Sequence, residues 1–371
     1  MKVTVERDAF AEAVLAASKA VAGKPHIPVL GGLLIRTADD GVTVSGFDYE
    51  VSHESWARGT VTDPGTALVS GRLLASIVKA LPGKPVELAS VGAHLELVCG
   101  AARFTLPTMP VEDYPTLPAL PEAIGTVDAA EFVAAINRAA VAASRDETLP
   151  MMTGVRVEFR AGTVDLLATD RYRLTHITIP FAGASDDLSV DLLIPAQVLV
   201  EAAKTWTGST IEVSAASGGD GLVGFADGRR KTTSRLLDGG NYPPVRSLFP
   251  STANATAIVS TGQLIEVVKR VALVAERTTP VLLTFAPDSP LIVEAGGTEE
   301  ARASESMDIG SYDGSPLTVG FNPQYLLDGL TTVGGDAQIA MVDAFKPAVI
   351  SPAGQTDNAH RYLIMPIRVS K

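Results

Sequence analysis

Three copies of one supersecondary pattern are spread along this chain of 371 residues, and such a repeat limits the fold more than any single motif does. Each copy contains an amphipathic helix that opens with a capping residue or a proline. These helices are predicted at 70–79, 195–204 and 322–330. The equivalent leucines Leu74, Leu199 and Leu326 lie 125 and 127 residues apart, which predicts three units of similar structure.

The other elements of each copy keep the same spacing. A further helix is predicted ahead of each of the first set, at 8–19, 128–138 and 261–270, where apolar residues recur at helical intervals. Hairpins with alternating strands are predicted at 41–54, 162–176 and 289–304. Asp48 in the first hairpin aligns with Asp170 in the second at an offset of 122 residues.

Proline-marked linkers follow the first two copies, at 112–123 and 239–252. Tyr114-Pro115 and Tyr242-Pro243 are 128 residues apart, and we expect both linkers to be extended and non-helical. The sequence therefore predicts three α+β units, each with two helices and several strands. Two unrelated α+β domains with coincidental spacing are the weaker alternative, because three helix pairs and two linkers stay in register.

Composition favours a cytoplasmic protein. The start, MKVTVERDAF, has no apolar segment typical of a signal peptide, and no apolar run approaches the roughly 18 residues that span a bilayer. Cys99 is the only cysteine, so the chain forms no internal disulfide and no multi-cysteine metal site.

Positive charge is concentrated in the predicted helices, although the net charge of the chain is −12. The segments 7–24, 70–84, 128–145, 195–204, 261–277 and 322–333 hold 12 Lys or Arg and 8 Asp or Glu, whereas the rest holds 18 and 34. The helix dipole alone accounts for cations such as Lys19 and Lys79 near helix ends. It does not account for the acids outside the helices, so a helical surface that faces a polyanion stays the functional interpretation.

The sequence offers no catalytic or metal-binding motif. The five histidines, His26, His53, His94, His176 and His360, show no zinc-ligand spacing. We find no nucleophile elbow and no phosphate-binding Walker loop. We therefore predict no catalytic residue, no metal and no cofactor.

Two stretches, LLATDRYRLT (166–175) and YLIMPIRV (362–369), closely resemble signatures of the bacterial DNA polymerase III β subunit family, the sliding clamps. The opening residues, the segment 23–35, the segment 321–330 and both Tyr-Pro linkers are similar too, so the resemblance covers the whole chain. It implies three repeated clamp domains, each with two helices packed on antiparallel sheets, which we place at 1–121, 122–250 and 251–371.

The resemblance also implies a function. Two clamp chains join head to tail in a closed ring around double-stranded DNA, without sequence preference, and the ring is not an enzyme. It holds the replicative polymerase on DNA. The polymerase III α subunit, the clamp loader, other DNA polymerases and repair proteins dock on it through short linear motifs.

Lys24 matches a DNA-contacting loop residue of the family. From helix position we add as DNA-facing candidates Arg72, Lys79, Arg138, Arg145, Lys204, Lys269 and Arg270.

By position, the family's peptide pocket would lie between the second and third domains. The second domain would supply Met152, Thr169, Arg171, Tyr172, Arg173 and Leu174, and the linker would supply Pro243, Ser247 and Leu248. The third domain would supply Thr278, Asn322, Tyr325, Phe345 and Pro347. The tail would supply Leu363, Met365, Pro366, Ile367, Arg368 and Val369.

Several of these residues have a second interpretation. Core packing explains Leu174, Leu248 and Leu363 as well as ligand contact does, and Arg173 and Arg368 suit surface ion pairs. Arg171 and Tyr172 depart from the small residue and histidine common in this loop, and Thr278 stands where a larger side chain is frequent. The alternatives for the whole protein are a specialised second clamp copy with altered partner or inhibitor binding, and an acidic α+β hydrolase.

Overall fold

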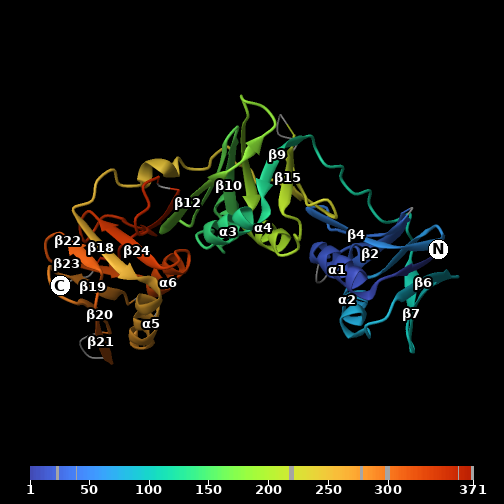
Figure 1. The fold of residues 1–371 in the computed structure, drawn as a ribbon, viewed down its shortest axis with the longest axis horizontal. Coiled ribbons are helices and arrows are strands. Elements are labelled where there is room, and N and C mark those ends of the chain that lie inside the picture. The colour runs from blue at the N-terminus through green and yellow to red at the C-terminus, as the bar shows by residue number, and fades with distance from the viewer. Residues whose placement is uncertain are drawn as a thin grey trace. The chain divides into compact units, whose positions relative to one another are not determined.

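The computed structural model describes residues 1–21, 25–38, 40–216, 221–275, 279–296, 301–357 and 359–368 (Figure 1). Its contacts divide the chain into two compact units. Unit 1 consists of Met1–Ala130, Phe181–Val190 and Val198–Leu236, and unit 2 of Glu131–Pro180, Asp191–Gln197 and Leu237–Lys371. The middle of the chain contributes to both units, and the domain boundaries near residues 121 and 250 stay predictions.

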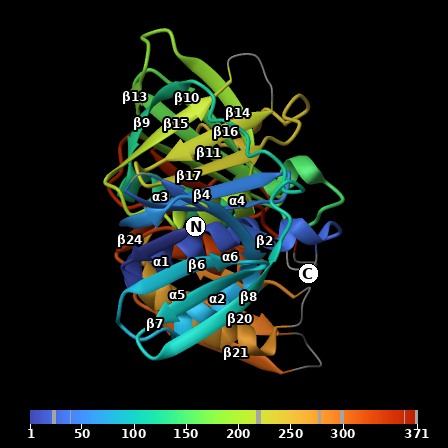
Figure 2. The same cartoon turned by 90° about the vertical axis from the view of Figure 1, so that its right-hand side faces the viewer.

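Unit 1 is built on one antiparallel sheet of 13 strands among the described residues. In spatial order these are β1 (Lys2–Val5), β6 (Val86–Val91), β7 (His94–Cys99), β8 (Ala102–Met109), β5 (Thr66–Ser70), β2 (Gly32–Ala38), β3 (Gly41–Phe47), β4 (Val51–Asp63), β17 (Arg230–Arg235), β16 (Leu222–Ala226), β15 (Thr210–Ala215), β9 (Ala123–Asp128) and β13 (Ala182–Gly183). Figure 2 shows β6, β7 and β8 side by side.

Two helices cover part of this sheet. Helix α1 (Arg7–Ala17) packs on β3 and β4, and α2 (Gly71–Ala80) packs on β2 and β5. Phe10 and Leu74 are fully buried in the core between helices and strands. The predicted N-cap Ser70 accepts a hydrogen bond from the Leu73 N–H at 3.5 Å.

Unit 2 contains two sheets. The first has, in spatial order, β14 (Ser189–Pro195), β10 (Gly154–Arg160), β11 (Thr163–Thr169), β12 (Arg173–Pro180), β26 (His360–Ile364), β25 (Ala348–Pro352), β24 (Asp336–Met341), β18 (Ala255–Ser260) and β22 (Ser311–Asp313). The second has β21 (Arg302–Met307), β20 (Leu291–Gly296), β19 (Val281–Phe285) and β23 (Leu317–Phe321). Strand β12 follows the turn that contains the predicted site residues Arg171 and Tyr172. Because β12 pairs with β26, this turn lies near the last strand of the described chain.

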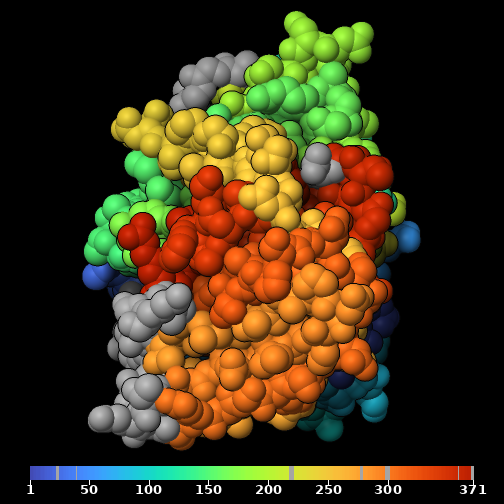
Figure 3. All heavy atoms as spheres, turned by 90° about the vertical axis from the view of Figure 1, so that its left-hand side faces the viewer, coloured from blue at the N-terminus to red at the C-terminus, as the bar shows by residue number. Residues whose placement is uncertain are grey.

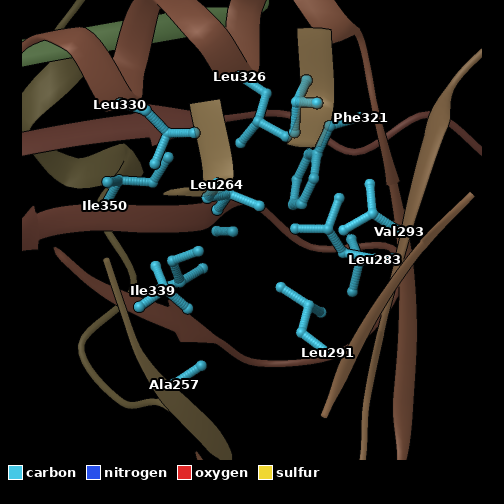
Figure 4. Close-up of a cluster of buried hydrophobic side chains, with 14 of the residues drawn as sticks. Ala257, Leu264, Leu283, Leu291, Val293, Phe321, Leu326, Leu330, Ile339 and Ile350 are labelled. Atoms are coloured by element: carbon cyan, nitrogen blue, oxygen red, sulfur yellow. The ribbon is translucent and has the colours of Figure 1, made fainter. Parts of the chain in front are cut away.

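The remaining helices are α3 (Ala129–Ala140), α4 (Ala196–Ala203), α5 (Thr261–Val271) and α6 (Pro323–Thr331). Figure 4 shows Leu264 of α5 and Leu326 of α6 directed toward Leu283 and Phe321. All four side chains are fully buried in one cluster. This core fixes α6, whose N-cap Asn322 accepts a hydrogen bond from the Tyr325 N–H at 3.1 Å.

The repeat predicted from sequence is confirmed in its elements, with two differences. All six predicted helices are present, and the first two predicted hairpins are β3–β4 and β11–β12. The third predicted hairpin corresponds to the antiparallel pair β20–β21, and its residues 297–300 lie outside the described residues. Strands β3 and β11 do not alternate as predicted, since all but one residue of β3 and all but two residues of β11 are buried. On β11 the linker residues Tyr242 and Val245 contribute to this burial by packing with Leu167. The second linker is not wholly extended, since residues Val245–Leu248 form a 3-10 turn in which the Ser247 hydroxyl donates to the Pro244 carbonyl.

Two buried histidines give the stability a predicted pH dependence. Burial is the main cause that lowers the pKa of His53, in unit 1, and of His360, in unit 2, from 6.5 to about 4. Between pH 6.5 and 4 the unfolded chain binds more protons at these two histidines than the folded protein does. Their contribution to the free energy of unfolding is therefore fully present above about pH 6.5 and is lost as the pH drops toward 4.

We expect each histidine to account for a loss of about 3 kcal/mol across that window. Urea unfolding measured at pH 7, 5.5 and 4 tests this prediction. His360→Gln, which keeps a polar partner for Thr332 (3.1 Å from the ring), should flatten the dependence. An unchanged slope in that variant would contradict the assignment.

Candidate peptide-binding site

The turn between β11 and β12 organises the predicted site. The Asp170 carboxylate accepts hydrogen bonds from the backbone N–H groups of Tyr172 and Arg173, each at 3.0 Å. The Thr169 hydroxyl donates to the Arg173 carbonyl at 2.7 Å. The same turn occurs in unit 1, where Asp48 accepts from the N–H groups of Glu50 and Val51. Asp170 was not among the predicted site residues, although its alignment with Asp48 marked it.

Arg173 connects this turn to α6 through two ion pairs. Its guanidinium donates to Asp170 at 2.9 Å and also to Asp328, and only 9% of the arginine side chain is exposed. Burial alone would lower the pKa of Arg173, but Tyr362, Asp328 and Asp170 raise it above the ordinary value, so the side chain stays charged. The alternative interpretation of Arg173 as a surface ion pair is wrong in one respect, since the arginine is buried while the Asp170 and Asp328 side chains are 10% and 26% exposed.

Aromatic rings and arginines stack beside this ion pair. The rings of Tyr172 and Tyr325 lie 6.2 Å apart at an interplanar angle of 25°. The Arg173 guanidinium lies 4.5 Å from the centre of the Tyr325 ring, and that of Arg171 lies 5.8 Å from the centre of the Tyr172 ring. Four side chains from the turn and α6 thus form one series of contacts, which we call the Arg–Tyr ladder (Arg171, Tyr172, Tyr325 and Arg173).

The tail leaves β26 alongside this ladder. The Met365 N–H donates to the Tyr172 carbonyl at 2.9 Å, and the Ile367 N–H donates to the Gly320 carbonyl at 2.8 Å. Tyr362 is fully buried under α6, with its hydroxyl donating to the Tyr325 carbonyl at 2.8 Å. Gly329 permits this packing, because a Cβ atom there would lie 2.4 Å from the Tyr362 ring. The apolar tail is thus a core strand up to Ile364, and the predicted site residues of the tail that are exposed or half-buried begin at Met365.

The linker 239–252 packs over the adjoining strands, and Figure 3 shows its yellow atoms against the red atoms of the C-terminal strands. Leu167, Leu174 and Leu363 form a buried cluster under Tyr242 and Val245. Next to the cluster, Pro243 and Ser247 line a cavity of about 400 Å³. Leu174 and Leu363 are therefore core residues, as one of their two interpretations predicts, and their contact with a ligand stays a prediction.

A cluster of charged side chains also holds the linker to the sheet, next to the apolar cluster. Arg246 donates to Glu158 at 2.5 Å and lies 2.9 Å from Asp165, while Arg361 lies 4.1 Å from the centre of the Phe249 ring. Burial alone would raise the pKa of Asp165. Hydrogen bonds with His176, Thr178 and Arg246 outweigh that effect and hold the pKa well below its usual range.

Unit 1 contains a counterpart of this region with different chemistry. The pairing registers of β2–β3–β4–β17 and β10–β11–β12–β26 are the same at an offset of 122 residues in the first three strands. The positions of the buried leucines Leu167, Leu174 and Leu363 are occupied there by Ser45, Ser52 and Thr233. The first linker covers a cavity of about 510 Å³ above these hydroxyls. A leucine floor thus occurs only at the second of these two equivalent positions.

The predicted site residues differ in how far their side chains are exposed to solvent. Thr169, Arg173, Leu174 and Leu363 are buried, whereas large apolar surface is presented by Tyr172 (53% exposed), Leu248 (55%), Phe345 (64%) and Met365 (38%). Half-buried positions are Met152, Pro243, Asn322, Tyr325, Pro347, Pro366 and Ile367, and exposed ones are Arg171, Ser247 and Arg368. Thr278 and Val369 lie outside the described residues.

The candidate DNA-facing residues fall into several groups. Arg72, Lys79, Arg138, Lys204, Lys269 and Arg270 are exposed. Lys204, Lys269 and Arg270 pair with Glu201, Glu266 and Glu305, which reduces their attraction for a polyanion. Arg145 is not on a helix as predicted, because α3 ends at Ala140 and a turn held by the Ser144 hydroxyl follows. Lys24 lies outside the described residues.

Within the described ranges, no group of three or more His, Cys, Asp or Glu side chains is placed to hold a metal ion. The helices of that same part of the chain include none long and apolar enough to cross a membrane.

Three domain families match the chain in order. They are the N-terminal domain of the DNA polymerase III beta subunit over residues 1–118, the central domain over 126–244 and the C-terminal domain over 246–368. The beta sliding clamp of Streptomyces coelicolor is 44% identical over the full length of both chains. The beta sliding clamp homolog GriR of Streptomyces muensis is 36% identical over 99% of both. The crystal structure of the Bacillus subtilis sliding clamp has a TM-score of 0.91 at 28% identity, with both chains fully covered.

Proposed function

Because this chain belongs to the DNA polymerase III β subunit family, the sliding clamps, we propose that it forms a head-to-tail dimeric ring around duplex DNA and confers processivity on the replicative polymerase. The proposal rests on the three-domain match, which runs through the chain without a gap longer than a short linker. A ring retains DNA by topology, so its contacts with phosphates stay weak and independent of sequence. No catalytic step is part of this function.

We further propose that partner proteins dock by short peptide segments on the surface that surrounds the Arg–Tyr ladder. The exposed apolar side chains of Tyr172, Leu248, Phe345 and Met365 support this assignment, since such a group on a soluble surface is typical of interaction sites. The rigid turn and the buried Arg173 beneath them preorganise the surface. Met365 also suits a site that accepts several ligands.

Topological retention on DNA tests the ring. The protein should sediment as a dimer of twice 38.6 kDa, and after loading by a clamp loader it should stay on nicked circular DNA through a wash at 0.5 M salt. Cutting the circle should release it, because a ring slides off a free end. A monomer, or a protein that salt removes from circular and linear DNA alike, would contradict the proposal.

A specialised clamp copy is the second candidate. The similarity to GriR and the unusual Arg171-Tyr172 pair favour it. Both candidates predict retention on circular DNA, but only the main clamp should also increase the length of DNA that the host's replicative polymerase synthesises in one binding event.

A further inference from the structure

Arg171 occupies a backbone conformation that suits glycine. Its φ is +80°, in the left-handed region that costs most residues free energy because Cβ approaches the backbone. The Asp170 hydrogen bonds impose this turn, and Tyr49 has the same strain (φ +76°) at the equivalent position of unit 1. Because Tyr49 has the same strain outside the candidate site, the positive φ belongs to the turn, and it fixes the direction in which the Arg171 side chain leaves the backbone.

Arg171 makes no close ion pair among the described residues, unlike its neighbours Arg173 and Arg246. Arg173 is neutralised by Asp170 and Asp328, and Arg246 by Glu158 and Asp165. Arg171 and Arg368 are exposed, and neither makes an ion pair within 4.0 Å among the residues that the structure describes. Asp146 is close enough for Arg171 to contribute to the lowering of its pKa, after the larger effect of hydrogen bonds from Thr148.

Tyr172 places this charge next to apolar surface. The tyrosine is 53% exposed, contacts Arg171 on the turn and stacks with Tyr325 on α6. Its carbonyl also accepts the hydrogen bond of the Met365 N–H, so the tail, the ladder and the charge share one position. A ligand that covers Tyr172 and Met365 therefore lies within reach of the Arg171 guanidinium.

We propose that Arg171 and Tyr172 determine partner choice at this site, by selecting peptides that carry an acidic side chain beside their apolar anchors. This inference rests on the proposed peptide docking and adds the chemistry of the partner. The apolar anchors cover the exposed side chains of Tyr172 and Met365, which the hydrogen bond from the Met365 N–H to the Tyr172 carbonyl holds together. The acidic side chain pairs with Arg171, whose position over the Tyr172 ring holds the guanidinium at the edge of that surface.

Fluorescence anisotropy with two labelled peptides tests the proposal. Both contain the clamp-binding segment of the host's replicative polymerase, with either Asp or Asn next to the last apolar anchor. The wild-type protein should bind the Asp peptide about fivefold more tightly, as expected for one partly exposed ion pair. Arg171→Gly and Arg171→Gln should abolish this preference, and Tyr172→Ala should weaken both peptides about tenfold.

The strain provides an internal control. Arg171→Gly relieves the left-handed backbone and should raise the melting temperature while the Asp preference is lost, so misfolding does not explain the loss. Tyr49→Gly removes the same strain in unit 1 and should leave both affinities unchanged. An Asp preference that survives in Arg171→Gly and Arg171→Gln would overturn the proposal. Wild-type protein that binds neither peptide would overturn the proposed partner site itself.

Discussion

Deletion of residues 365–371 is expected to abolish the binding of partner peptides while the fold and the dimer stay intact. The deletion removes the exposed wall that begins at Met365, together with the hydrogen bonds from the Met365 N–H to Tyr172 and from the Ile367 N–H to Gly320. It spares β26, which ends at Ile364 and carries the buried Tyr362 and Ile364 of the unit 2 core. This variant should therefore lose peptide binding but still form the dimer.

Anisotropy with the labelled polymerase peptide measures the first effect, and sedimentation measures the second. A matched variant, Met365→Ala with Ile367→Ala, keeps both backbone hydrogen bonds and should lose only part of the affinity, because it removes apolar contact area alone. Unimpaired peptide binding by the deletion variant would show that the tail is not a wall of the site. A deletion variant that no longer dimerises would contradict the expectation that residues 365–371 contribute to peptide binding alone.

The sequence predicted the repeated elements because each one has a local cause. Ser70 and Asn322 cap helices, apolar residues recur at helical spacing, and the two Tyr-Pro linkers are separated by 128 residues, close to the spacing of the helices. The turn at 169–173 was visible for the same reason, since Asp48 and Asp170 align between copies and each accepts backbone hydrogen bonds. Local hydrogen bonding is encoded within a few residues, so it can be predicted from them.

Contacts between distant segments were not predictable in this way. The partnership of Arg173 with Asp328 joins residues 155 positions apart, and that of Arg361 with the Phe249 ring depends on how the linker crosses the strand. The same limit applies to burial, because Leu174 and Leu363 form a floor only where β12 pairs with β26 under Tyr242. The resemblance to a family placed these residues at the site, but their roles follow from the packing.

Arg173→Ala is expected to lower the free energy of unfolding of the cooperative unit that contains the site by about 3 kcal/mol or more. Removal of the guanidinium leaves Asp170 and Asp328 without their partner, and the Asp170 side chain is only 10% exposed. Because Asp170 also holds the turn and Asp328 lies on α6, the Arg–Tyr ladder should lose its order at the same time. Peptide affinity should therefore fall together with stability.

Urea unfolding followed by circular dichroism, with peptide anisotropy on the same samples, measures both quantities. Lys269→Ala breaks an ion pair of unit 2 whose side chains are 57% and 60% exposed, and it should change little, because water solvates both charges. Arg173→Lys should fall between the two variants, since an ammonium keeps the charge but does not reproduce the fork that reaches two carboxylates. A loss in Arg173→Ala no larger than that in Lys269→Ala would mean that water replaces the guanidinium at no cost. In that case the buried pair would not be what holds the turn against α6.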